Sequence, residues 1–165
     1  MARVFLLLKA LLKGTPLLLA AACGAATPAA TPAPAGQRLT VNPPGIAPVV
    51  PAYSVAVMTG DLVFLSGMIG TVPGTQDVIG GGVAAQTRQA LQNIGAALAA
   101  AGSTLADVVE CTVFLRDMGD YAAMNAVYRE FFPRDPPARA TVAVVALPLP
   151  AALVEIKCSA RTGRR

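Results

Sequence analysis

Apolar side chains recur at intervals of three and four residues from Val83 to Ala101, and this spacing predicts an amphipathic helix. Polar residues such as Gln86 and Arg88 fall on the opposite side, and Gly102 is a typical helix stop. The pattern therefore places one long helix near the middle of the chain.

A second, shorter helix is expected after Asp120, a residue type favoured as an N-cap. Prolines 133, 136 and 137 end it, because proline cannot continue a helix. Its apolar stripe consists of Tyr121, Met124, Tyr128 and Phe131.

Strand patterns surround these helices. Residues 53–67 predict two strands around a Thr59-Gly60-Asp61 turn, in which glycine supplies a positive φ. Further strands are expected at 39–42, 108–115, 139–146 and 151–160. The order β-β-α-β-α-β-β, after a short first strand, indicates an α+β domain.

Two helices cover only one face of such a sheet, and the strands are apolar on both alternations. A second copy of the chain is therefore expected to bury the other face.

The first residues have the order of an export signal. Residues 1–22 begin with Arg3, Lys9 and Lys13, continue into a short apolar run and end in small residues. Lys9 and Lys13 interrupt the apolar stretch, so it is too short for a stable transmembrane span. Residues 23–37 are rich in Pro, Ala and Thr and predict an extended tether. The globular domain is expected at 38–162, followed by a basic tail at 163–165.

Two modes of cleavage remain open. Residues 19–24 resemble a bacterial lipobox, in which Cys23 would be lipidated and would anchor a periplasmic lipoprotein to its membrane. The alternative is ordinary cleavage at an Ala-x-Ala site between Ala20 and Ala35. A third interpretation, an apolar N-terminal helix of a cytoplasmic protein, is disfavoured by the tether-like segment. Export, with the domain in the periplasm, is the expectation.

Charge and composition narrow the chemistry. The formal charge is +4, from 13 Lys and Arg against 9 Asp and Glu, but the excess sits at the two ends of the chain. The sequence therefore gives no sign of a nucleic-acid-binding surface. It contains no histidine, which excludes a Ser-His-Asp or Cys-His arrangement, and its three cysteines lie far apart, which disfavours zinc. No metal site is expected.

Two charged residues stand in unusual places. Arg139 begins an apolar strand, where a guanidinium can hold a carboxylate through parallel hydrogen bonds, although a strand-end arginine can also simply reach solvent. Glu155 lies inside the apolar run 153–156 and is either on a solvated face or desolvated and used. A desolvated carboxyl group has a raised pKa, which suits proton transfer near neutral pH.

Other residues carry weaker signals. Tyr53, Ser66 and Asn125 are compatible with structural roles when each is considered alone. Cys111 and Cys158 fall in expected strands, where buried inert thiols are favoured. A disulfide between them is the alternative in an oxidising compartment.

Taken in order, the segments resemble the RidA family, also called YjgF, from about residue 53 to 160. The resemblance rests on the hairpin Gly60–Gly67, the helix segment 86–94 and the strand 108–115. It extends through Asn125-Ala126-Val127-Tyr128 with Phe131-Phe132, Pro137-Ala138-Arg139, and Leu147-Pro148 through Glu155-Ile156. No single motif is decisive, but their order and spacing together are specific.

The resemblance implies a chorismate-mutase-like fold, with one mixed sheet and two helices on one face, and a homotrimer with clefts between subunits. It implies hydrolysis of small enamines and imines that carry a carboxylate, such as 2-aminoacrylate, to a 2-keto acid and ammonia, and it implies no cofactor. Arg139 would grip the carboxylate, Glu155 would orient or activate water, and Tyr53, Ser66 and Asn125 would line the cleft. A deaminase should place Arg139 and Glu155 within reach of one ligand. The alternatives are a non-catalytic binding or chaperone-like trimer and, less favoured, an endoribonuclease or translation inhibitor.

Overall fold

The computed structural model of this protein describes residues 36–46 and 52–162. The expected signal segment, Cys23, nearly all of the tether and the basic tail lie outside the described residues. The elements follow the order β1 (Arg38–Val41), β2 (Ala56–Thr59), β3 (Leu62–Leu65), β4 (Met68–Ile69), α1 (Gly82–Ala100), β5 (Val108–Leu115), α2 (Tyr121–Phe131), β6 (Ala138–Ala143) and β7 (Val154–Arg161). Short 3-10 turns at Leu105–Asp107 and Met118–Asp120 precede β5 and α2.

The strands form one mixed sheet in the order β1-β2-β3-β7-β5-β6, with β4 also paired to β7. Only β5 and β6 run parallel; the other pairs are antiparallel. A parallel pair needs a crossover connection, and α2 supplies it between β5 and β6. Gly60 turns the β2–β3 hairpin with a φ of 57°, as the sequence predicts.

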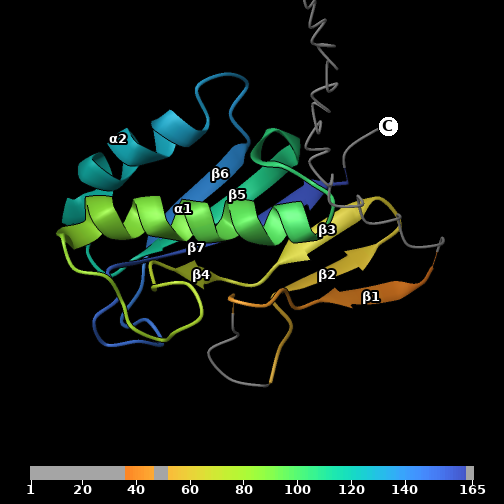
Figure 1. The fold of residues 1–165 in the computed structure, drawn as a ribbon. Helices are drawn as coiled ribbons and strands as arrows, with labels where there is room; N and C mark the ends of the chain where they lie inside the picture. The colour runs from red at the N-terminus through yellow and green to blue at the C-terminus, as the bar shows by residue number, and fades with distance from the viewer. Residues whose placement is uncertain (1–35, 47–51, 163–165) are drawn as a thin grey trace, which may run out of the picture.

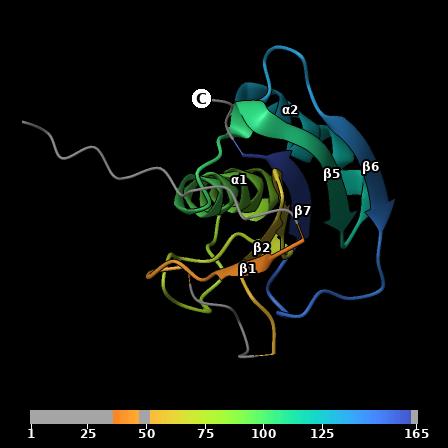
Figure 2. The same ribbon diagram turned by 90° about the vertical axis from the view of Figure 1, so that its right-hand side faces the viewer.

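Both helices cover the same face of the sheet, with α1 crossing its middle and α2 beside it (Figures 1 and 2). The core lies between α1 and the central strands. Its fully buried side chains include Leu91, Ile94 and Leu98 from α1 and Val63, Val113 and Ile156 from the strands. The predicted α+β architecture, with two helices on one face, is confirmed.

Several local predictions need correction. The two-residue strand β4 was not expected, β6 ends at Ala143 rather than at residue 146, and β7 begins at Val154 rather than at residue 151. Asp120 does not cap α2 through its side chain. Instead Asp117 accepts a hydrogen bond from the Gly119 amide and starts the 3-10 turn before the helix.

The favoured interpretation of Cys111 and Cys158 as free thiols is wrong in this structure, where the two form a disulfide. They are direct partners on the antiparallel strands β5 and β7, with Cα atoms 4.1 Å apart. Both are buried against the helices. The bond therefore joins two central strands on the inner side of the sheet.

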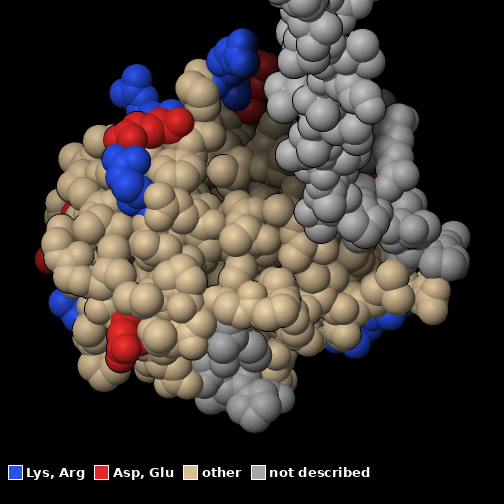
Figure 3. All heavy atoms as spheres, viewed as in Figure 1, with Lys and Arg blue, Asp and Glu red and all other residues tan. Residues whose placement is uncertain are grey.

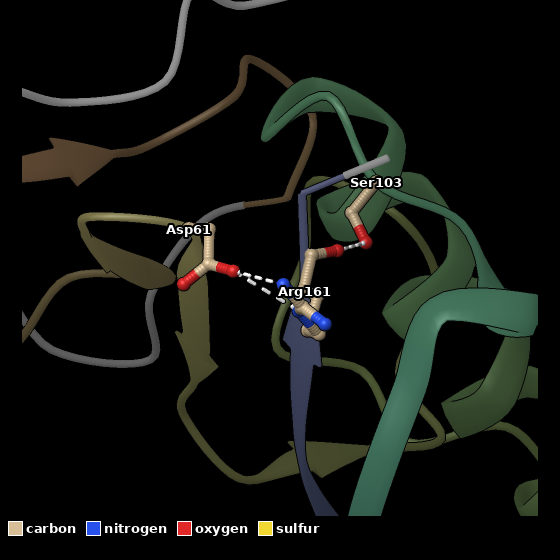
Figure 4. Close-up of polar contacts among 3 residues, drawn as sticks. All are labelled: Asp61, Ser103 and Arg161. Atoms are coloured by element: carbon tan, nitrogen blue, oxygen red, sulfur yellow. Dashed lines mark hydrogen bonds and ion pairs between the residues drawn. The ribbon is translucent and has the colours of Figure 1, made fainter. Parts of the chain in front are cut away.

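A polar cluster ties the end of β7 to two neighbouring loops (Figure 4). The Arg161 guanidinium forms an ion pair with Asp61, which lies in the β2–β3 turn. The Ser103 hydroxyl donates to the Arg161 carbonyl oxygen from the loop after α1. The Thr162 amide adds a bond to the Asp61 carbonyl oxygen. These contacts fix the last described residues without placing charge in the core.

The face of the sheet opposite the helices has no covering layer among the described residues. Large apolar side chains are partly exposed on this face, among them Leu62 and Phe64 of β3 and Val142 of the edge strand β6. Apolar side chains on such a face favour burial against another surface. Burial of this face by a second copy of the chain stays a prediction.

Candidate functional site

A cavity of about 230 Å³ opens beside β4, between the hairpin and the loops that follow β1 and β4. Its walls are largely apolar, with Ile46, Val55, Met68 and Ile69 among them. Tyr53, Ser66 and Glu155, three of the predicted site residues, also line it. The structure therefore brings these three together.

Glu155 is the one charged residue in the described lining of this cavity. It is half-buried, and desolvation raises the pKa of its carboxyl group above its ordinary value of 4.5. The carboxyl group lies against Gly67, where a Cβ atom would overlap Glu155 Oε1. Glycine at position 67 thus makes the space in which this carboxylate sits.

The other polar groups of the lining are engaged within the fold. Ser66 donates its hydroxyl to the Ser54 carbonyl oxygen at 2.7 Å. The Asn93 amide donates to the carbonyl oxygens of Ile69 and Thr71. Glu155, by contrast, has no protein hydrogen-bond partner among the described residues. Its carboxylate is therefore the group of this cavity best able to act on a ligand or a water molecule.

Arg139 and Asn125 form a second group, on β6 and α2. The Arg139 Nη2 atom donates to Asn125 Oδ1 at 2.8 Å and to the Tyr121 hydroxyl at 3.1 Å. The guanidinium also lies over the Tyr128 ring, 4.5 Å from its centroid, a cation–π contact. No acidic side chain of the described residues pairs with it, since the ion pairs found there are Arg88–Glu130 and Arg161–Asp61. A half-buried guanidinium held by neutral groups can receive an anion.

Tyr128 itself is buried, and its hydroxyl has no hydrogen-bond partner in the described part of the chain. Burial raises the pKa of this phenol to about 12, although the positive charge of Arg139 acts in the opposite direction. Tyr128 therefore contributes its ring face rather than a titrating group.

The two groups lie on opposite faces of the sheet within one protomer. The β5 register pairs Cys111 with Arg139 and Phe114 with Glu155. Side chains alternate between faces along a strand, so residues three positions apart face opposite ways. Cys111 is buried on the helix side, and Arg139 shares that side with it, whereas Glu155 faces away. The expected proximity of Arg139 and Glu155 is therefore absent within a single protomer.

Sequence reasoning missed three residues that shape these groups: Tyr121, Tyr128 and Gly67. The two tyrosines were assigned to the apolar stripe of the second helix. The spacing of 121, 125 and 128 places all three on one face of a helix, and this was the available signal. The role of Gly67 depends on a strand pairing that the sequence does not encode locally.

The described residues also bear on charged surfaces, metal sites and membrane-spanning helices. The face drawn in Figure 3 is mostly uncharged, with its few Lys, Arg, Asp and Glu side chains near the edges. Within residues 36–46 and 52–162, no three His, Cys, Asp or Glu side chains gather as metal ligands would. No helix in the same ranges has the length and hydropathy needed to cross a membrane.

Comparison with known proteins places the chain among relatives of similar size. RutC family protein PH0854 of Pyrococcus horikoshii is 45% identical over 108 residues, which are 66% of this chain and 85% of that protein. The rat 2-iminobutanoate/2-iminopropanoate deaminase is 42% identical over 59% of this chain and 71% of its own length. The crystal structure of the Escherichia coli YjgF gene product superposes with a TM-score of 0.70 at 36% identity, over 77% of this chain and 99% of that one.

A family match covers most of the domain. Residues 45–162 match the family described as Endoribonuclease L-PSP, and this range includes both candidate groups. The fold, the match and the relatives agree: the chain belongs to the RidA (YjgF) family.

Proposed function

We propose that the protein hydrolyses small imines that carry a carboxylate, releasing a 2-oxo acid and ammonia. The observation that carries the proposal is a pair of half-buried charged groups that have no oppositely charged partner among the described residues, the Arg139 guanidinium and the Glu155 carboxylate. Relatives named as imine deaminases in rat and human support it. No cofactor is needed, because water is the only co-reactant.

The reaction can be written with the residues present. An enamine first tautomerises to the imine, and the water oxygen then adds to the imine carbon while the nitrogen gains a proton. The resulting carbinolamine loses ammonia as its C–N bond breaks and the carbonyl forms. Glu155 would orient the water and pass its proton to nitrogen, for which a raised pKa is suitable. Arg139 would hold the substrate carboxylate, and this orientation reduces the entropic cost of the addition.

The separation of the two groups leads us to propose that each complete site forms between subunits. Glu155, Tyr53 and Ser66 would come from one protomer, and Arg139 and Asn125 from its neighbour. The partly exposed apolar residues of the open sheet face, Leu62, Phe64 and Val142, support such contacts. The homotrimer typical of the family would provide three equivalent sites.

Mixing two inactive variants tests the reaction and the shared site together. Glu155→Gln and Arg139→Ala should each abolish ammonia release from imines made in situ by an amino-acid oxidase. Co-refolded in equal amounts, they should recover about a quarter of the parent activity, because one site in four would take both intact residues from different protomers. No recovery in correctly assembled mixed trimers would refute the shared site. No turnover by the parent across a broad imine panel would refute the deaminase.

A binding or chaperone-like role is the second candidate, favoured by the exposed apolar side chains of the open sheet face. It predicts that Arg139→Ala leaves activity unchanged, with suppression of client aggregation as the readout. If the open face is the subunit interface, the assembled protein should not suppress aggregation.

We also propose that the chain is exported. The disulfide between Cys111 and Cys158 supports this, since disulfides persist mainly in oxidising compartments. Cell fractionation, with the cleavage point found by mass spectrometry, tests it. Recovery of full-length chain from the cytoplasm would refute it.

A further inference from the structure

We propose that Tyr121 is a carboxylate-recognition residue of this site, which positions Arg139 and supplies a hydroxyl hydrogen to the substrate carboxylate. This inference rests on the proposed function, because it concerns the group that would hold the substrate. The sequence pattern predicts only a packing role for Tyr121, which belongs to the apolar stripe of α2.

The hydrogen bonds of Arg139 carry the first step. Nη2 has two hydrogens, and two bonds leave from it, to Asn125 and to Tyr121. A guanidinium usually holds a carboxylate through two adjacent N–H groups. Arginine offers two such pairs, Nε with Nη2 and Nη1 with Nη2, and each pair uses a hydrogen of Nη2. With Nη2 committed, Arg139 retains Nε and Nη1, and a second strong bond to the carboxylate calls for another donor.

Tyr121 is placed to be that donor. Its hydroxyl oxygen accepts from Arg139 at 3.1 Å, and a phenol that accepts one bond still has its own O–H to donate. Tyr121 is 40% exposed, so this hydrogen can reach a ligand that approaches Arg139 from solvent. The carboxylate would then bridge the guanidinium and the phenol.

Two aromatic side chains of α2 and its C-terminus, Tyr128 and Phe132, support the Arg139 guanidinium. The Tyr128 ring lies 4.5 Å from the guanidinium carbon, against 5.8 Å for the Tyr121 ring. Tyr128 is also packed on Phe132, with ring centroids 4.7 Å apart. Tyr128 is buried, so its ring is held in place by packing. Tyr121 is the first residue of α2 and is partly exposed. The two tyrosines therefore act differently: Tyr128 supports the cation, and Tyr121 contacts the anion.

Tyr121→Phe tests this with the ring retained and only the hydroxyl removed. Met118→Leu is the matched control, an exposed residue in the turn just before α2. On the assembled protein, calorimetry measures the Kd for 2-oxobutanoate, which carries the carboxylate of the proposed product. Steady-state kinetics with the corresponding imine gives KM and kcat, and thermal unfolding gives Tm.

We expect Tyr121→Phe to raise both Kd and KM by about 10-fold, the size of a lost hydrogen bond to a charged group, with kcat and Tm close to the parent. Met118→Leu should change none of these. Unchanged Kd and KM would overturn the inference but would not affect the proposed deaminase activity. A fall in kcat together with Tm would show that Tyr121 has a structural role, and it would also overturn the inference. A parent that binds 2-oxobutanoate through Tyr121 but hydrolyses no imine would keep the inference and refute the deaminase. A parent that binds no 2-oxo acid would refute both.

Discussion

The Cys111–Cys158 disulfide should contribute a large part of the stability of this fold. The two residues are 47 apart in sequence, and in the chain-entropy description a closed loop of that length stabilises the folded state by about 4 kcal/mol at 25 °C. A domain of this size is typically stable by only about 5–15 kcal/mol. Replacing both cysteines by alanine should therefore remove a large fraction of the free energy of unfolding.

Urea unfolding at fixed protein concentration measures this effect. We expect the Cys111→Ala/Cys158→Ala variant to lose about 3–5 kcal/mol, and the m-value to rise because the unfolded chain is no longer cross-linked. Each single substitution should cost nearly as much as the pair, since either one removes the same bond. Cys23→Ser serves as the common background, so that only these two thiols are counted.

Two results would refute this reasoning. A double variant within about 1 kcal/mol of the parent would show that the cross-link adds little. Two thiols titrating in unfolded parent protein, purified without reductant from an oxidising compartment, would show that the bond does not form.

Three further substitutions test the site and its support. Glu155→Gln should abolish turnover but stabilise the fold. Because the pKa of Glu155 is raised in the folded state, that state binds more protons than the unfolded state between the unfolded and the folded pKa, so ionisation of Glu155 lowers stability as pH rises through this range. Its Tm advantage should thus grow with pH and vanish in acid; an advantage independent of pH would contradict this. Gly67→Ala should displace the Glu155 carboxylate and cost about 100-fold in activity, whereas Gly80→Ala, with nothing within 4 Å of its added Cβ, should be neutral; equal activities would count against the proposed role of Glu155. Gln86→Met should cost about 3 kcal/mol in unfolding free energy, because the Gln86 side chain donates to the Ile79 and Ala151 carbonyl oxygens and accepts from the Leu153 amide. Gln92→Met, at an exposed position on the same helix, is its control, and similar losses in both would refute the network.

Most of the fold follows from local patterns. The α1 helix differs from its predicted bounds by one residue at each end, because its apolar periodicity is long and regular. The two-residue β4 has no such pattern, since it exists through pairing with β7 rather than through its own sequence. The cysteine pairing likewise depends on a register between β5 and β7 that sequence spacing does not reveal.

The candidate residues could be named from the sequence, but their grouping could not. Successive side chains of a strand point to opposite faces of the sheet, so the faces of Arg139 and Glu155 depend on their positions in their strands. In a sequence, the buried face is predicted from the alternation of apolar and polar residues. Strand β7 alternates apolar and polar residues, so its pattern does predict that Glu155 points away from the buried side. Strand β6 does not follow this rule, because Arg139 shares the helix side with Cys111 while the apolar Val142 is exposed on the other side. The cavity beside Glu155 also combines loops distant in sequence, near Ile46, Pro73 and Pro148. These are properties of the assembled sheet.

The place of β7 in the sheet decides when the chain can fold. It is the last described strand to be synthesised, yet it lies between β3 and β5 and joins them. Without residues 154–161 the remaining strand pairs form two separate groups, β1-β2-β3 and β5-β6, and β4 has no partner. The sheet is therefore completed only after residues 154–161 have been made.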